Sequence, residues 1–197
     1  MQEPSARRSN RERTEATRSA LIAAARALFV EKGYAETGTP EIVAAANVTR
    51  GALYHHFADK ADLFRAVVEQ EAQAVAAGIK REALASAPAL EAMTAGAEAY
   101  FAAMAVPGRA RLLLLDGPSV LGHGEVARID RETGGRELHD GLAAALPPET
   151  LQNAPLEALT EVLSAAFDRA ALAIAEGQPA EDYKAAVRLV LIKLLDG

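Results

Sequence analysis

The chain has 197 residues and a formal net charge of −6, and alanine supplies 46 of its residues, nearly half of the hydrophobic set. Alanine is the best helix former, and the β-branched and aromatic residues that favour strands are sparse, so the composition predicts an all-α fold. Because the chain has no cysteine, it excludes disulfides, thiolate metal sites and a cysteine nucleophile. No apolar run approaches the roughly 20 residues of a membrane span, and the N-terminal residues do not resemble a secretion signal. We therefore expect a soluble, cytoplasmic protein with no membrane partner.

The charge is unevenly distributed along the chain. Residues 1–60 contain nine Lys/Arg and seven Asp/Glu, whereas residues 61–197 contain twelve and twenty. This asymmetry predicts a basic N-terminal module attached to an acidic body. Residues 1–12 are expected to form a flexible basic arm, and a solvated tail is the simpler interpretation of the arginine cluster that begins there.

The first elements in chain order are a long helix and a short one. Apolar residues recur at three- and four-residue steps over residues 14–31, which predicts a helix. Gly33 follows it, in the position where a left-handed residue closes a helix. The next helix is predicted over Pro40–Ala46, with either Thr39 or Gly38 as its N-cap.

A second short helix, Arg50–Phe57, follows a turn that contains Asn47. A tight turn between two helices requires a positive φ, which asparagine tolerates best after glycine. Thr49 can cap this helix, and Asp59 or its neighbour can cap a long helix from Lys60 to about Ser86. Proline and glycine separate the further predicted helices, which are roughly Ala89–Ala105, Arg109–Leu115, Val120–Leu146 (weakened at Gly134–Gly135), Pro155–Glu176 and Ala180–Leu195.

Residues 39–57 contain the most informative pattern, two short helices joined by a three-residue turn. On the second helix, Leu53 and Phe57 lie four residues apart and can face the core. The opposite face then holds Arg50, Gly51, Tyr54 and His55. Such a face can enter a nucleic-acid groove while the helix start presents amide groups to phosphates; a surface patch is the alternative for the Tyr–His–His run.

The run "TGTPEIVAAANVTRGALYHHFADKADLF", residues 37–64, closely resembles the DNA-binding signature of the tetracycline-repressor-like (TetR/AcrR) family of transcription regulators. The resemblance implies a homodimeric repressor that binds a palindromic operator in double-stranded DNA. It implies a helix-turn-helix DNA-binding domain over residues 13–60 and an effector-binding and dimerisation domain over residues 61–197. Asn47, where the family usually has glycine, and Gly38, where a hydroxyl residue is common, depart from the pattern.

The resemblance assigns DNA contacts to residues that match the family motif. It implies phosphate contacts at Thr39, Thr49 and Lys60, base-edge positions at Arg50 and Gly51, and backbone or groove contacts at Tyr54 and His55.

The region beyond residue 64 is expected to bind an unknown small-molecule effector. Its binding would release the repressor from DNA through the long helix that begins at Lys60. Larger apolar groups and a few polar ones are candidates for the pocket, and a core or surface position is the alternative for each: Met93, Tyr100, Phe101, Met104, Leu114, Asp116, His123, Arg128 and Phe167.

The last two predicted helices are candidates for the dimer interface, because each carries an apolar stripe at helical spacing. An intramolecular core is the alternative. The candidate interface residues are Leu159, Leu163, Ala166, Phe167, Ala170, Tyr183, Val187, Val190, Leu191 and Leu194.

No catalytic motif is present, and the four histidines are not spaced as metal ligands. We therefore expect no enzyme activity, no cofactor and no metal. The rival interpretation is an all-α ligand-binding protein or enzyme whose N-terminal helices are only structural.

Overall fold

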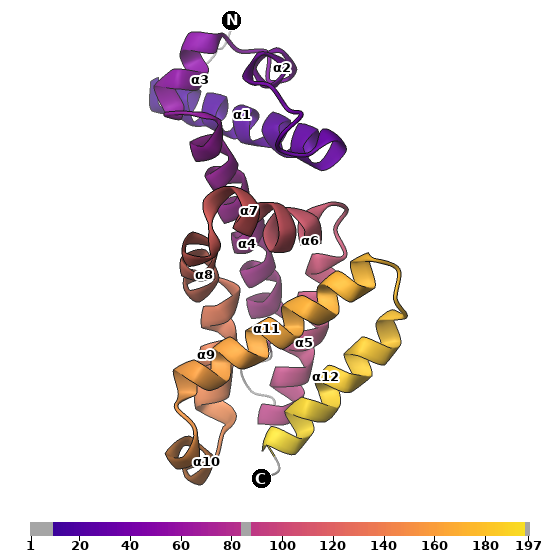
Figure 1. The fold of residues 1–197 in the computed structure, drawn as a ribbon. Coiled ribbons are helices and arrows are strands. Elements are labelled where there is room, and N and C mark those ends of the chain that lie inside the picture. The colour runs from indigo at the N-terminus through magenta and orange to yellow at the C-terminus, as the bar shows by residue number, and fades with distance from the viewer. Residues whose placement is uncertain (1–9, 84–87, 196–197) are drawn as a thin grey trace, which may run out of the picture. The chain divides into compact units, whose positions relative to one another are not determined.

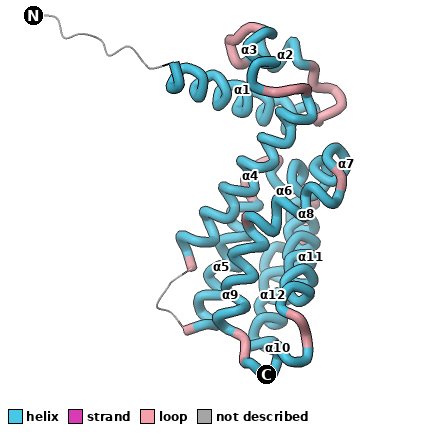
Figure 2. Tube along the Cα trace, turned by 90° about the vertical axis from the view of Figure 1, so that its left-hand side faces the viewer, coloured by secondary structure: helices cyan, strands magenta, loops and turns pink. Residues whose placement is uncertain are grey.

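The computed structural model describes residues 10–83 and 88–195, and among them every regular element is a helix (Figures 1 and 2). The predicted all-α fold is therefore confirmed. The chain forms two compact units that meet between Val67 and Val68. Within the described residues, no helix is both long enough and apolar enough to cross a membrane.

The first unit contains α1 (Asn10–Lys32), α2 (Thr39–Ala45), α3 (Arg50–His56) and the beginning of α4 (Lys60–Glu82). Its core is built from side chains that are at most 3 % exposed, namely Leu21, Ile22, Ala25, Phe29, Ile42, Leu53, Phe57, Leu63 and Phe64. The rings of Phe29, Tyr34 and Phe64 form a cluster with centroids 5.0–5.7 Å apart.

The boundary between the units lies within α4, whereas the sequence placed it at the start of this helix. The reason is that Leu63 and Phe64, in the first turns of α4, are buried in the core of the first unit. At the other end of the unit, α1 begins at Asn10, so residues 10–12 are helical instead of belonging to the predicted arm. Residues 1–9, the rest of that arm, lie outside the described residues.

The ends of the short helices follow from local backbone chemistry. The N-cap of α2 is Gly38, in extended conformation, so the second of the two predicted registers is the observed one. Asn47 has a φ of 52°, and no other described non-glycine residue has a positive φ; the predicted turn geometry is confirmed. Helix α3 is capped by Thr49, as predicted: the Thr49 hydroxyl accepts a hydrogen bond from the backbone amide of Ala52 at 3.2 Å. Asp59 caps α4 by accepting one from the amide of Asp62 at 2.8 Å.

The second unit contains the remainder of α4 and a bundle of helices (Figure 2). In chain order these are α5 (Ala89–Met104), α6 (Arg109–Arg111), η1 (Leu112–Asp116), α7 (Gly117–Leu121), α8 (His123–Glu132), α9 (Gly134–Ala145), α10 (Pro148–Asn153), α11 (Leu156–Ala175) and α12 (Ala180–Leu195).

Two stretches of this unit differ from the sequence prediction. The single helix expected over Val120–Leu146 is broken at Gly122, which has a φ of 85°, and again at Thr133, whose backbone is not helical. The segment after Arg111 winds as a π-helix, η1, before α7 begins. Pro148, predicted only as a breaker, starts the short helix α10, because proline fits the first helical position.

The core of the second unit joins α5, α9, α11 and α12. Its buried members are Met93, Ala97, Phe101, Leu142, Leu146, Leu163, Phe167, Ala170 and Leu191. Beside this core, Glu71 of α4 and Arg109 of α6 form a buried ion pair at 2.8 Å. The Arg109 guanidinium also donates a hydrogen bond to the carbonyl of Ala103 at 2.7 Å, so it fastens α4 to the end of α5.

Candidate DNA-binding face and ligand cavity

Helix α3 has one buried face and one face open to solvent. Leu53 and Phe57 are 0 % and 3 % exposed and anchor the helix in the core. The predicted contact residues Arg50, Gly51, Tyr54 and His55 are all exposed, and Tyr54 has 45 % of its surface accessible. The buried pair thus fixes which way the helix presents its polar side chains.

The predicted residues Thr39, Arg50 and Tyr54 come together on this face, although they belong to two helices. The Arg50 guanidinium carbon lies 5.5 Å from the centroid of the Tyr54 ring. Hydrogen bonds to Thr39 and then to Arg50 lower the pKa of the Tyr54 phenol below its usual value. Thr39 is free for this contact because Gly38, and not Thr39, caps α2. The cluster therefore joins the start of α2 to the middle of α3.

Lys60 has a different environment from the one that the motif implies. Its ammonium donates hydrogen bonds to the carbonyls of Tyr34 and Thr37 at 2.9 and 3.0 Å. It also lies 4.1 Å from the centroid of the Tyr34 ring. Lys60 consequently ties the loop after α1 to the start of α4, and only one of its three N–H groups is left for a phosphate.

Arg18 of α1 is a cation that the sequence analysis did not assign to this region. Its guanidinium lies 5.4 Å from the centroid of the Phe57 ring, at the end of α3. Burial, followed by the charges of His55 and Arg18, lowers the pKa of His56. Arg18 and Phe57 are far apart in sequence, so only the packing of α1 against α3 could reveal the contact.

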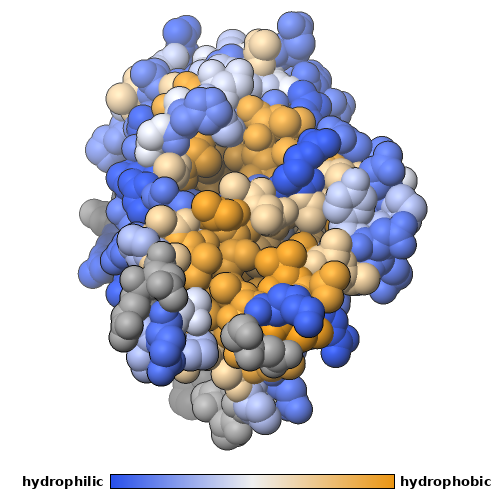
Figure 3. Space-filling model, turned by 60° about the horizontal axis from the view of Figure 1, so that its bottom comes forward, coloured by the Kyte–Doolittle hydropathy of each residue, from blue (hydrophilic) through white to orange (hydrophobic). Residues whose placement is uncertain are grey.

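A cavity of about 540 Å³ lies within the second unit, among α4, α5, η1, α8, α9 and α11. Figure 3 shows hydrophobic residues gathered around a hollowed face of the molecule. The predicted pocket residues that line the cavity are Met93, Tyr100, Met104, Leu114 and Phe167. Helix α4 contributes Val68, Ala72, Val75 and Ile79, which the sequence analysis did not assign.

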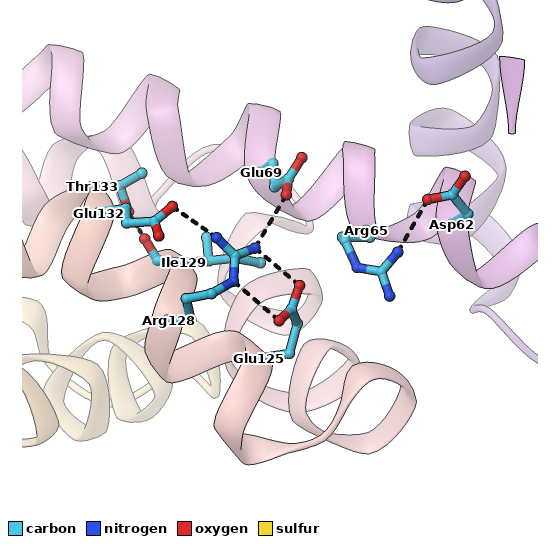
Figure 4. A network of polar contacts seen from close by, with 8 residues as sticks. All are labelled: Asp62, Arg65, Glu69, Glu125, Arg128, Ile129, Glu132 and Thr133. Carbon is cyan, nitrogen blue, oxygen red and sulfur yellow. Dashed lines mark hydrogen bonds and ion pairs between the residues drawn. The ribbon is translucent and has the colours of Figure 1, made fainter.

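Four predicted pocket residues do not line the cavity. Phe101 is buried in the core and is not among the residues that line the cavity. Asp116 lies 3.3 Å from the Arg111 guanidinium, and His123 is exposed at the start of α8. Arg128 pairs with Glu69, Glu125 and Glu132 at 3.5, 2.9 and 2.7 Å (Figure 4). Asp130, two residues further along α8, does line the cavity.

The polar groups that do line the cavity centre on two carboxylates. Tyr100 donates a hydrogen bond to Asp168 at 2.7 Å, and Ser164 donates one to Asp130 at 3.0 Å. The amide of Gly135 donates to the other oxygen of Asp130 at 3.1 Å. Burial raises the pKa of Asp130, and it raises the pKa of Asp168 to about 6, with a further contribution from the charge of Asp130.

A sequence signal for these carboxylates exists in α11. Ser164 and Asp168 are four residues apart, so they share a face, and each directly follows a core residue, Leu163 or Phe167. A serine and an aspartate at the edge of an apolar stripe indicate a polar lining more specifically than the scattered residues that were predicted.

The predicted dimer stripe divides into a buried and an exposed part. Leu163, Phe167, Ala170 and Leu191 belong to the core of the same subunit and leave little surface for a second copy. Leu159, Tyr183, Val187 and Leu194 pack against that core and are half-buried. Only Ala166 and Val190 of the predicted set are exposed.

The opposite sides of α11 and α12 carry exposed apolar groups, of which Val162 and Leu189 are not among the predicted interface residues. Val162 and Leu189 are 68 % and 57 % exposed, and Val190 beside Leu189 is 51 % exposed. We call Val162, Ala166, Leu189 and Val190 the outer face of α11 and α12, two helices that pack as a hairpin (Figure 1). Helical periodicity alone does not distinguish this face from the inner one, which the subunit's own core occupies.

Comparison with known families gives these features a common context. Residues 21–67 match the family described as "Bacterial regulatory proteins, tetR family". Residues 90–197, more than half of the chain, match "Tetracyclin repressor-like, C-terminal domain". The chain belongs to the tetR family. The resemblance seen in residues 37–64 is therefore confirmed.

Several relatives of this tetR-family protein are known. It is 32 % identical over 95 residues to the HTH-type transcriptional activator FasR of Mycolicibacterium smegmatis, a match that covers 48 % of this chain and 43 % of FasR. It is 44 % identical over 62 residues to the HTH-type transcriptional repressor BepR of Brucella suis, covering 32 % of this chain and 29 % of BepR. The matched segments thus span less than half of these curated relatives.

A solved structure resembles this tetR-family protein over nearly its whole length. It is a TetR-family transcriptional regulator from Pectobacterium atrosepticum, with 31 % identity and a TM-score of 0.71, and the match covers 96 % of this chain and 99 % of that one. A TetR-family regulator from Syntrophomonas wolfei shares the fold at 17 % identity, with a TM-score of 0.76 over 93 % and 96 % of the two chains.

Proposed function

We propose that this protein is a cytoplasmic, homodimeric transcription regulator that binds a palindromic DNA operator and leaves it when a small molecule occupies the cavity. The observation that carries the proposal is the exposed face of α3, where Arg50, Gly51, Tyr54 and His55 are open to solvent while Leu53 and Phe57 hold the helix in place. In a helix-turn-helix protein, such a second helix enters the major groove. The protein then acts by binding DNA and not by catalysis.

The contacts on this face fall into two classes. Arg50 and Gly51, at the start of α3, lie where base edges are read, and arginine bonds guanine through two N–H groups. Thr39, Thr49, Tyr54 and His55 would contact the phosphate backbone, and backbone contacts set position and orientation without reading sequence. The Lys60 ammonium donates two of its hydrogen bonds to the carbonyls of Tyr34 and Thr37, so it would contact a phosphate only through its third N–H group.

The outer face of α11 and α12 is the proposed dimer interface. Large apolar groups exposed together indicate a surface that another molecule covers, and a twofold dimer brings the same surface of each subunit together. Ala166, on this face, permits close approach of facing helices. Two recognition helices must then lie about 34–36 Å apart, one DNA turn, to enter successive major grooves.

Helix α4 offers a route from the cavity to the DNA-binding unit. Its later turns line the cavity with Val68, Ala72, Val75 and Ile79. Its first residue, Lys60, belongs to the first unit and bonds the carbonyls of Tyr34 and Thr37 there. A ligand that favours one position of α4 would shift the population toward dimers that fit the operator less well, and differential affinity for the two states releases the DNA.

The test is binding to duplex DNA from the region upstream of the protein's own coding sequence, titrated at several salt concentrations. A regulator should prefer this DNA to a scrambled duplex, and its affinity should fall steeply with salt as counterions are released. Arg50→Ala should lose base preference, by about 1–3 kcal/mol. The matched control is Arg136→Ala, an exposed arginine on α9 in the other unit.

Two results would overturn the proposal. One is an absence of salt-dependent duplex binding, which would favour the rival interpretation of an all-α ligand-binding protein or enzyme with a structural N-terminal module. The other is equal loss of binding for Arg50→Ala and Arg136→Ala, which would show that α3 does not read DNA.

A further inference from the structure

The cavity of the second unit carries charge of one sign. Asp130, Glu137 and Asp168 are among its lining residues, and no lysine, arginine or histidine is among the described residues that line it. Arg131 favours the ionised form of its neighbour Asp130, but its exposed guanidinium lies 4.0 Å from Glu161 and outside the cavity. Any charged ligand therefore meets carboxylates only.

Neutral donors hold the two central carboxylates in place. Asp168 accepts its hydrogen bond from the Tyr100 phenol, and Asp130 accepts from the Ser164 hydroxyl and the Gly135 amide. A buried carboxylate is costly unless it is paired with an opposite charge. The hydrogen bonds orient these two groups, but they leave the negative charge without a cationic partner.

Two aromatic rings line the same cavity as these carboxylates. Tyr100 and Phe167 both line the cavity, with ring centroids 5.4 Å apart in an edge-to-face arrangement. Phe167 precedes Asp168 in α11, and Tyr100 bonds it directly. The faces of aromatic rings attract cations, so rings and carboxylates favour the same type of ligand.

Apart from Thr133, the other side chains that line the cavity are apolar, and some of them are adaptable. They include Met93 and Met104, whose unbranched thioether side chains fill irregular gaps and accept ligands of different shape. A volume of about 540 Å³ falls within the range of about 300–1,000 Å³ that is usual for small-molecule sites. The ligand can therefore have a body of several fused or linked rings.

We propose that the cavity binds an organic cation, a molecule with an apolar body and an amine or quaternary ammonium group that lies between Asp130 and Asp168. The positive charge compensates both carboxylates at once, and the body replaces water along the apolar wall. A ligand whose anionic group enters the cavity meets like charge, which costs affinity, and a neutral ligand gains only the apolar contribution. This inference rests on the proposed function, because it names the class of effector that the cavity would take.

The experiment compares three fluorescent probes with one body and three charges. They are 1-pyrenemethylamine, 1-pyrenemethanol and 1-pyrenecarboxylate, titrated with the full-length protein at pH 7.5 and followed by fluorescence anisotropy. We expect the amine to bind at least about tenfold more tightly than the alcohol, and the carboxylate more weakly than the alcohol, because one ion pair of partly buried groups is worth that much or more.

Matched variants separate charge from shape. Asp168→Asn and Asp130→Asn keep the shape of the side chain and remove its charge, so each should weaken the amine about tenfold and change the alcohol by less than about twofold. The control Asp140→Asn removes an exposed carboxylate from α9, and it should leave all three affinities unchanged. Circular dichroism verifies that each variant keeps its helices.

The outcomes distinguish this inference from the proposed function. Equal affinities for the three probes, tightest binding of the carboxylate, or an unchanged amine preference in both Asn variants would overturn the inference, even if the protein binds DNA. Preferential amine binding that depends on Asp130 and Asp168, in a protein that fails to bind duplex DNA, would support the inference and overturn the proposed function.

Discussion

Asp168 should lower the stability of the unliganded protein at neutral pH. Burial raises the pKa of this carboxyl to about 6 from an ordinary 3.8, and each pKa unit corresponds to about 1.4 kcal/mol. Ionised Asp168 therefore costs the folded state about 3 kcal/mol at pH 7. The variant Asp168→Asn should recover much of this, less the part lost because an amide is a weaker acceptor for the Tyr100 hydroxyl.

The pH dependence has a definite sign. Between about pH 4 and pH 6 the folded protein holds a proton on Asp168 that the unfolded chain has released, so stability falls as the pH rises through this window. Above it the full cost is present. The groups that face Asp168 are Tyr100 from α5 and Asp130 from α8, with Glu137 of α9 in the same cavity, and α4 contributes no titratable lining residue.

The assay is urea unfolding of the wild type and of Asp168→Asn at pH 4.5 and pH 7.5, followed by circular dichroism. We expect the variant to be more stable by about 1–3 kcal/mol at pH 7.5 and the difference to shrink at pH 4.5. The control Asp140→Asn should show no such pH-dependent gain. An Asp168→Asn protein that is less stable than wild type at pH 7.5, or a difference that does not change with pH, would refute the reasoning.

Four further results are expected. Arg109→Met should destabilise the protein by about 3–5 kcal/mol in urea unfolding, because it removes the Arg109 partner of the buried Glu71 carboxylate. The double variant with Glu71→Leu should recover most of this loss. Losses that add up in the double variant would contradict this expectation. Lys60→Ala should lower the melting temperature as well as DNA affinity, since its ammonium bonds two carbonyls, and a variant that loses affinity at unchanged melting temperature would assign Lys60 to DNA alone. Asn47→Ala should lower the free energy of unfolding by about 1 kcal/mol, because alanine lacks the short polar side chain that helps asparagine adopt a positive φ. Asn47→Gly should leave the thermal stability unchanged or raise it. Val190→Glu should shift the protein toward monomers in sedimentation analysis, and an unchanged mass would place the dimer interface elsewhere.

Local chemistry made the DNA-binding unit predictable. The Thr49 cap and the Asn47 turn depend on bonds and dihedral angles within a few residues, so the sequence contains all that decides them. The amphipathic spacing of Leu53 and Phe57 likewise fixes which face of α3 is exposed. The family follows from this same short segment, and the matched domains agree with it.

The tertiary structure decided what depends on distant partners. Lys60 appears in sequence as a free cation beside the DNA contacts, yet it bonds the carbonyl of Tyr34 twenty-six positions away. Arg18 reaches Phe57 only because α1 packs against α3. In the second unit, the three- and four-residue spacing of apolar residues predicted the helices. It did not distinguish the residues that line the cavity from those that fill the core or face outward.

Asp168 illustrates the physical reason most clearly. Its position four residues after Ser164, at the edge of an apolar stripe, indicates a polar lining residue, but only folding places it against Tyr100 and within the field of Asp130. Periodicity is a property of one helix, whereas burial and charge compensation belong to the set of helices packed around a site. The sequence by itself therefore determined the all-helical class, the turn and cap around α3 and the face of α3 that is exposed, and only the packing of the helices decided which side chains form the cavity and what charge it offers a ligand.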